Sequence, residues 1–176
     1  MDELQVFSTS GARSRAGQPR PFRTEAELRR FVVQHAMRLL GVRIVASEYL
    51  VDRNGGGRID AIGLDVKFAP VVIEFKRTAS GLTICQALYY LDWLDQHREI
   101  FASLVLRRLG KRIPSNIAWE AARLLCIAEV IGPREEAVAR QIGRAVELLQ
   151  VQRYARGVVT IQRAPSTAED AGQKHQ

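Results

Sequence analysis

The chain has 176 residues, of which 47% are hydrophobic and 26% charged, with a formal net charge of +7. This length suffices for one domain with a hydrophobic core, and the positive charge favours polyanionic partners such as nucleic acid. The two cysteines form no CxxC pair or Cys/His cluster, which argues against a zinc site and favours buried free thiols in a reducing compartment. No apolar run is long enough to cross a membrane and no signal-peptide core is present, so we expect a cytoplasmic protein without a membrane partner.

The two ends of the chain have the composition of solvated segments. Residues 1–23 read as a flexible basic arm, since residues 8–23 are rich in Ser, Gly and Pro and carry four arginines and no acid. An arm that contacts a phosphate backbone is the alternative. Residues 164–176 are predicted to be a disordered tail, which leaves residues 24–163 for the folded domain.

Hydrophobic periodicity between these ends predicts an alternating series of helices and strands. We expect helices over 24–40, 82–97 and 133–149, with 98–110 either extending the second helix or forming another. We expect strands over 42–51, 57–65, 70–77 and 123–132, and a final strand or hairpin over 151–163. The order αβββαβαβ predicts one α/β domain with a mixed β-sheet flanked by helices.

Two acidic residues interrupt strands that are otherwise apolar. The short segment 66–69 predicts a hairpin centred near residue 67, in which residues whose numbers sum to about 134 face each other. Asp60 then lies opposite Glu74, with Cβ atoms roughly 5 Å apart. Two such carboxylates repel each other. A divalent cation that prefers hard oxygen ligands, Mg²⁺ or Mn²⁺, would compensate them.

Lys76 lies two residues beyond Glu74 and therefore shares its face of the strand. It could hold an attacking water or stabilise charge that develops on a phosphate. The alternative is an ion-pair network at a sheet edge, with Arg58 or Arg77 as the counter-charge for the acids.

The segments "GGRIDAIGLD", "VVIEFKR" and "QALYYLDWL", in this order, resemble the PD-(D/E)XK nuclease superfamily. Within it, the chain is most similar to the catalytic domain of NucS-type (EndoMS-like) endonucleases, over roughly residues 24–163 and most strongly over 55–94. The resemblance implies a restriction-endonuclease-like fold and Mg²⁺- or Mn²⁺-dependent hydrolysis of phosphodiester bonds, with DNA as the favoured partner and endonuclease activity favoured. A homodimer is left open, and the separate N-terminal DNA-binding domain of longer relatives has no counterpart in this sequence.

The resemblance also assigns roles to individual residues. Asp60, Glu74 and the backbone carbonyl of Phe75 would hold the metal, and Lys76 would lie beside the nucleophilic water. Gln86 would belong to the catalytic set.

Three further residues, Arg58, Arg77 and Tyr90, are the candidates for contact with nucleic acid. Gln86 and Tyr90 match the Gln-x-x-x-Tyr motif of the family and share one helix face. The competing interpretation is that Thr83 and Gln86 form a capping box that satisfies the helix terminus.

The family usually takes one more acid from its first helix, and Glu25 and Glu27 are the candidates, with Glu27 assigned to the catalytic set. Thr24 and Glu27 also fit a capping box. Glu48, on the first predicted strand, is a weaker alternative.

Two features near the hairpin have structural interpretations that we prefer. Asp65 is expected to bond backbone in the turn rather than to bind metal. Residues 54–58, "NGGGR", form either a flexible turn or a loop that approaches a phosphate, but they lack the layout of a nucleotide-binding loop.

Two other functions remain open. The first is a non-catalytic nucleic-acid-binding module that retains the nuclease fold, and the second is an interaction domain in which the acid pair is merely salt-bridged. Metal dependence separates the nuclease from both.

Overall fold

The computed structural model describes residues 5–8, 18–51, 56–110, 117–142, 146–155 and 158–164. Its strands are β1 (Gln5–Ser8), β2 (Val42–Leu50), β3 (Arg58–Asp65), β4 (Pro70–Thr78), β5 (Arg123–Val130), β6 (Val146–Arg153) and β7 (Val158–Arg163). Its helices are α1 (Glu25–Gln34), α2 (Ala36–Leu40), α3 (Gly81–Gln96), α4 (Arg98–Leu109), the 3₁₀-helix η1 (Trp119–Ala121) and α5 (Pro133–Gln141). None of these helices is long and apolar enough to cross a membrane.

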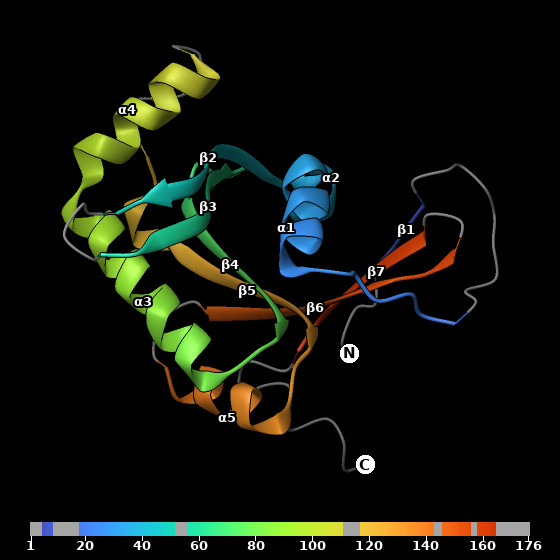
Figure 1. Cartoon of the computed structure of the whole chain (residues 1–176). Coiled ribbons are helices and arrows are strands. Elements are labelled where there is room, and N and C mark those ends of the chain that lie inside the picture. The colour runs from blue at the N-terminus through green and yellow to red at the C-terminus, as the bar shows by residue number, and fades with distance from the viewer. Residues whose placement is uncertain are drawn as a thin grey trace, which may run out of the picture.

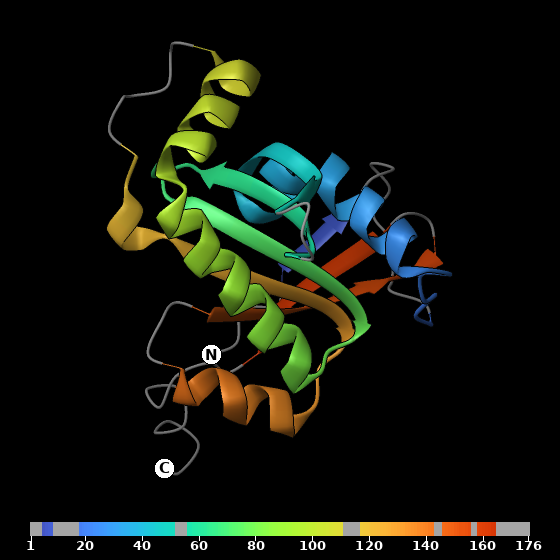
Figure 2. The ribbon, with the colours of Figure 1, turned by 60° about the vertical axis from the view of Figure 1, so that its left-hand side comes forward.

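The strands form one mixed sheet in the order β1-β7-β6-β5-β4-β3-β2. The pairs β4–β5 and β5–β6 are parallel, and the remaining pairs are antiparallel. Helix α3 covers one face of the central strands and α1 covers the other (Figure 1). Helices α3 and α5 pack next to each other (Figure 2). The predicted α/β domain with a mixed sheet flanked by helices is confirmed.

Strand β4 divides the hydrophobic core into two layers. Val72 packs in the layer under α3, with Ile84 and Leu91 of that helix. Ile73 packs in the layer under α1, with Leu28. Both faces of β4 are buried, as its nearly continuous apolar run predicts. A charged side chain between Pro70 and Phe75 therefore has little access to water.

The predicted helix over 24–40 is divided at His35 into α1 and α2. Gly41 ends α2 with a φ of +66°, a left-handed conformation that glycine adopts without steric cost. The segment 98–110 forms a helix of its own, α4, after α3 ends at Gln96.

The prediction of a helix over 133–149 is wrong at its C-terminal end. Helix α5 ends at Gln141, and Val146 already begins β6. Val146 and Leu148 are buried beside β5, with which β6 forms a parallel pair. Pairing with the sheet thus outweighs the helix propensity of the "VELL" segment.

The prediction of a flexible arm over 1–23 does not hold where the structure describes that segment. Gln5–Ser8 form β1, which pairs with β7 at the end of the sheet. Phe22 is buried, and its N–H donates to Glu129 Oε1 at 2.7 Å. Residues 9–17 lie outside the described residues, and so does the predicted tail except for the buried Ala164.

Candidate active site

Strands β3 and β4 pair in the predicted register. Ala61 faces Ile73 and Ile62 faces Val72, so the residue numbers of each pair sum to 134. Continued by one residue, this register places Asp60 opposite Glu74. The Asp60 N–H donates to Glu74 Oε1 at 3.3 Å, and the Phe75 N–H donates to Asp60 Oδ2 at 3.0 Å. The two carboxylates are therefore neighbours.

Both acids are buried, and the charge of Asp60 affects the ionisation of Glu74. Asp60 is 5% exposed and Glu74 is 2% exposed. Burial, followed by the negative charge of Asp60, raises the pKa of Glu74 to about 8. Glu74 has no ion-pair partner among the described residues. The Glu74 carboxyl group therefore strongly favours its protonated form.

Cys126 of β5 lies beside Glu74 in the sheet. Burial and then the charge of Glu74 raise the pKa of this thiol to about 12, so it is not a candidate nucleophile. The prediction of a buried free thiol is confirmed for Cys126 and wrong for Cys85, which is exposed on α3.

Lys76 reaches the first helix. Its Nζ lies 3.0 Å from Glu25 Oε1, in the first turn of α1. Both side chains are about a third exposed, at 32% for Lys76 and 36% for Glu25. The ammonium group is thus held at the solvent-accessible end of the strand that carries the buried Glu74.

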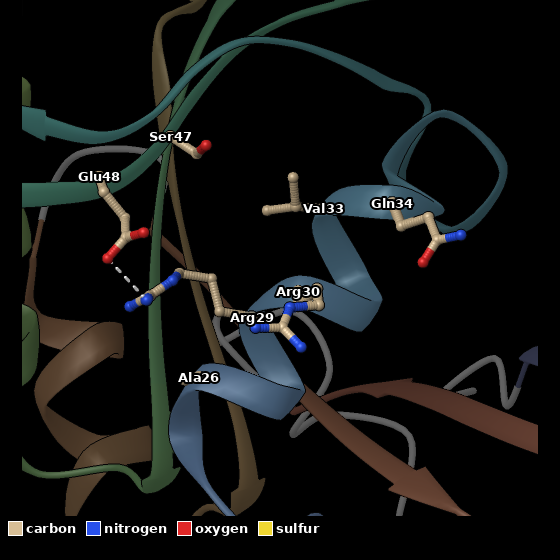
Figure 3. Close-up of a pocket in the computed structure, with 7 residues that line it drawn as sticks. All are labelled: Ala26, Arg29, Arg30, Val33, Gln34, Ser47 and Glu48. Carbon is tan, nitrogen blue, oxygen red and sulfur yellow. Dashed lines mark hydrogen bonds and ion pairs between the residues drawn. The ribbon is translucent and has the colours of Figure 1, made fainter.

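Arg29 of α1 belongs to this site, although the sequence analysis did not select it. Its Nη1 lies 3.0 Å from Asp60 Oδ1 and its Nη2 lies 2.8 Å from Glu48 Oε1. Figure 3 shows Arg29 reaching from α1 to Glu48 of β2. The spacing of Glu25 and Arg29, four residues apart on one helix face, is the signal that could have found it.

Glu48 lies in an unusual backbone conformation beside Asp60. In the pairing of β2 with β3, Ser47 faces Ala61 and Tyr49 faces Ile59, so Glu48 falls next to Asp60. Its φ of +51° is left-handed, which is uncommon for a residue with a side chain and is concentrated at functional sites. The weaker sequence candidate therefore lies at the site.

The predicted counter-charges for the acid pair are wrong. Arg58 pairs with Glu48 at 3.0 Å, and Arg77 pairs with Glu129 at 3.2 Å. Both arginine side chains are about half exposed, so they remain available at the surface. The counter-charge of Asp60 is Arg29.

Gln86 and Tyr90 lie together on α3, as their spacing predicts. The Gln86 Nε2 donates to the Tyr90 hydroxyl at 2.7 Å, and that hydroxyl also accepts the N–H of Arg58 at 3.1 Å. The alternative capping box of Thr83 and Gln86 is wrong, because Ser80 is the N-cap and its side chain accepts the N–H of Thr83. The pair instead connects α3 to the start of β3.

Tyr90 is only 1% exposed, so the prediction that its side chain contacts nucleic acid is wrong in this structure. Its hydroxyl packs against the glycine-rich segment that precedes β3. A Cβ added at Gly57 would lie 2.5 Å from the Tyr90 hydroxyl oxygen, and the φ of Gly57 is +86°. The close approach of the Tyr90 hydroxyl to the backbone therefore explains why position 57 is a glycine.

Glu27 is not brought to the acid pair. Its N–H donates to Thr24 Oγ1, and its Oε2 accepts the N–H of Arg23 at 2.7 Å, which is the capping-box alternative. Arg153 bonds its Oε1, and this hydrogen bond, with that from Arg23, lowers the pKa of Glu27. The acid of the first helix that reaches the site is Glu25.

Asp65 has the predicted turn role. Its Oδ1 accepts the N–H groups of Lys67 and Ala69 at 2.8 and 2.9 Å, and its Oδ2 pairs with Arg123. The first residues of the "NGGGR" segment, 54 and 55, lie outside the described residues.

Within the described residues, no three His, Cys, Asp or Glu side chains gather closely enough to hold a metal ion. The oxygen donors that are adjacent are the carboxylates of Asp60 and Glu74. The backbone carbonyl of Phe75 follows directly in the chain. This set consists of hard oxygen donors, which suit Mg²⁺ or Mn²⁺ rather than a softer metal.

Comparison with known proteins gives matches among solved structures alone, since no family model and no curated protein matches the chain. A repair endonuclease from Pyrococcus abyssi superposes with a TM-score of 0.50 at 18% identity, covering 76% of this chain and 50% of that one. A structure described as an EndoMS–dsDNA2 complex gives a TM-score of 0.47 at 17% identity, covering 77% of this chain and 49% of that one.

The chain thus spans about half the length of the structures that it matches. Its fold is that of the repair endonuclease from Pyrococcus abyssi, and the predicted restriction-endonuclease-like fold is confirmed.

Proposed function

We propose that the protein is a metal-dependent nuclease that hydrolyses phosphodiester bonds of DNA, with endonuclease activity favoured. The observation that carries the proposal is the buried pair of Asp60 and Glu74, opposite each other on β3 and β4. Two adjacent buried carboxyl groups, of which only Asp60 has an ion-pair partner among the described residues, destabilise a protein unless a ligand binds them. The fold shared with a repair endonuclease supports the choice of reaction.

Asp60, Glu74 and the Phe75 carbonyl would hold Mg²⁺ or Mn²⁺. When bound, such an ion would lower the pKa of a water molecule and stabilise charge on the phosphate and the leaving oxygen. The donor chemistry fits this ion, because all three candidate ligands are oxygens and two of them carry or can carry negative charge. The raised pKa of Glu74 means that metal binding would release a proton near neutral pH.

Lys76 would supply positive charge for the reaction at the edge of this pair. Its contact with Glu25, 3.0 Å away, fixes the ammonium group near the surface, where a phosphodiester can approach. There the ammonium could orient the attacking water and favour the developing phosphate charge. Glu25 is then a positioning residue that acts through Lys76.

The half-exposed Arg58 and Arg77 are our candidates for contact with the DNA backbone. Gln86 would contribute through its bond to Tyr90, which positions the start of β3 only two residues before Asp60. The net charge of +7 agrees with a polyanionic partner.

A non-catalytic nucleic-acid-binding module is the second candidate, favoured by the charge alone. The intact set of Asp60, Glu74 and Lys76 favours the enzyme, because binding to a phosphate backbone does not require two buried acids.

The test is incubation with branched, mismatched, single-stranded and duplex DNA, with Mn²⁺, with Mg²⁺ or with EDTA. We expect metal-dependent cleavage of at least one substrate by the natural chain and none by the Glu74→Gln variant. DNA binding without cleavage in any metal would support the binding module instead. Cleavage that persists in EDTA would refute the proposed metal site.

A further inference from the structure

The guanidinium of Arg29 is shared between two acids of the candidate site. One nitrogen bonds Asp60 and another bonds Glu48, at 3.0 and 2.8 Å. The Arg29 side chain is 15% exposed, whereas that of Glu48 is 47% exposed. The arginine therefore connects a buried acid to a surface acid.

The inner contact involves a carboxylate that the proposed metal would need. Asp60 accepts a backbone N–H from Phe75 with one oxygen and Arg29 with the other. Both carboxylate oxygens of Asp60 thus accept hydrogen bonds. The positive charge beside Asp60 is the guanidinium of Arg29.

We propose that Arg29 serves as the counter-ion of Asp60 in the metal-free protein and that it is transferred wholly to Glu48 when a divalent cation binds. This inference rests on the proposed function. Arg29 then competes with the cation for Asp60, and metal binding releases its inner nitrogen for contact with a phosphate.

The surroundings of Arg29 allow this movement. The guanidinium group lies at a pocket of about 280 Å³ between α1 and β2, whose lining is drawn in Figure 3. The second anchor on Glu48 keeps the side chain at the site after the first bond is lost. A guanidinium has five donors in a planar fork, so one nitrogen can stay on Glu48 while another faces a phosphate oxygen.

The competition follows from electrostatics. A divalent cation bound to Asp60 and a guanidinium bound to the same carboxylate would lie a few ångströms apart and repel each other. Removing the arginine should therefore strengthen metal binding. It should also destabilise the metal-free protein, because a buried carboxylate would lose its counter-charge.

The matched control for Arg29 is its neighbour Arg30. Arg30 lines the same pocket and is exposed, and it forms no ion pair with Asp60 or Glu48. Arg29→Gln and Arg30→Gln remove the same charge from the same turn of α1. Their difference separates the contacts of Arg29 with Asp60 and Glu48 from the general effect of net charge.

The experiment is calorimetric titration of MnCl₂ into the natural chain and both variants, with thermal melting in EDTA and in saturating Mn²⁺. We expect Arg29→Gln to bind Mn²⁺ about tenfold more tightly than the natural chain, which corresponds to about 1.4 kcal/mol. Arg30→Gln should differ from the natural chain by less than about twofold. Arg29→Gln should melt lower in EDTA but gain more in melting temperature from Mn²⁺.

The outcomes separate this inference from the proposed function. If the natural chain binds Mn²⁺ and Arg29→Gln binds no more tightly than Arg30→Gln, the inference is wrong and the proposed metal site stands. If neither the natural chain nor Arg29→Gln binds Mn²⁺, both are wrong. Binding by Arg29→Gln alone would support the competition. If Arg29→Gln does not fold, Arg29→Lys is the second variant, because it keeps the positive charge but loses the planar guanidinium. It should fold and bind Mn²⁺ within about threefold of the natural chain. Binding of Mn²⁺ by Arg29→Lys that is about tenfold tighter than by the natural chain would refute competition through charge.

Discussion

Acids are buried at both ends of the β3–β4 hairpin, and Asp65 at the turn and Glu74 at the open end behave in opposite ways. At the turn, Asp65 is 5% exposed, and burial tends to raise its pKa. The hydrogen bond from Arg123, with those from the backbone of Ala69 and Lys67, outweighs burial and lowers the pKa. At the other end, Glu74 is 2% exposed, and burial and the charge of Asp60 raise its pKa to about 8.

Burial alone therefore does not distinguish a structural acid from a candidate functional one. Asp65 has a partner for each of its oxygens, and its partners stabilise the ionised form. Glu74 accepts the N–H of Asp60 but faces another acid and has no ion-pair partner in the described part of the chain. An acid that folding leaves under-compensated is a candidate for ligand binding.

The largest expected effect contrasts two lysines at the two ends of this hairpin. Lys76→Ala should reduce metal-dependent DNA cleavage by about a thousandfold, because the charge that favours the transition state is lost. Its Mn²⁺ affinity should be kept or slightly raised, since a nearby positive charge is removed. Cleavage assays with calorimetry on the same samples measure both.

The control for Lys76 is Lys67→Ala, at the exposed turn. It should leave cleavage within about threefold of the natural chain, because it removes the same charge far from the acid pair. Equal losses of cleavage in both variants would mean that the lysines act through the effect of net charge on DNA binding, and not through the position of Lys76 beside the acid pair.

The second prediction compares how replacing Asp65 and replacing Glu74 change the stability of the protein. Asp65→Asn should lower the free energy of unfolding by about 3 kcal/mol, because it breaks a buried ion pair with Arg123. Glu74→Gln should change it by less than about 1 kcal/mol or stabilise the metal-free protein, because it introduces a neutral side chain where burial and Asp60 already disfavour a negative charge. Urea denaturation in EDTA measures both, and a Glu74→Gln variant less stable than Asp65→Asn would make Glu74 the structural acid.

The sequence predicted those parts of the fold and site that depend on local pattern. The four-residue connection between two apolar strands determined the register, and hence the adjacency of Asp60 and Glu74. Gln86 and Tyr90 were brought together by helix spacing. The turn role of Asp65 followed from the behaviour of Asp in turns.

The parts that depend on long-range contact could not be predicted in the same way. Glu25 and Glu27 both begin one helix, and only the position of Lys76 and Arg153, far along the chain, assigns each to its partner. Strand β1 pairs with β7 from the opposite end of the sequence. Arg29 resembles an ordinary surface residue of an amphipathic helix until β2 and β3 are placed beside it.

The smallest expected effect concerns the pH dependence of stability in the metal-free protein. Between the ordinary pKa of 4.5 and about 8, the native state keeps a proton on Glu74 that the unfolded state has lost. Because the native state then binds more protons, stability falls as pH rises through this window. We expect a decline of about 1 to 2 kcal/mol between pH 5 and pH 8, less than a single isolated group would give, because the Glu74 carboxyl group interacts with other charged groups of the site.

Asp65 should act in the opposite direction and in a different range. Its lowered pKa contributes stability above the ordinary value of 3.8, and that contribution is lost as pH falls below it. Urea denaturation across pH in EDTA should therefore show a flatter curve between pH 5 and pH 8 for Glu74→Gln. Asp65→Asn should keep the slope of the natural chain in this range while lying lower throughout. If Asp65→Asn flattens the curve and Glu74→Gln does not, the under-compensated acid lies at the turn, and the contrast between the two ends of the hairpin is reversed.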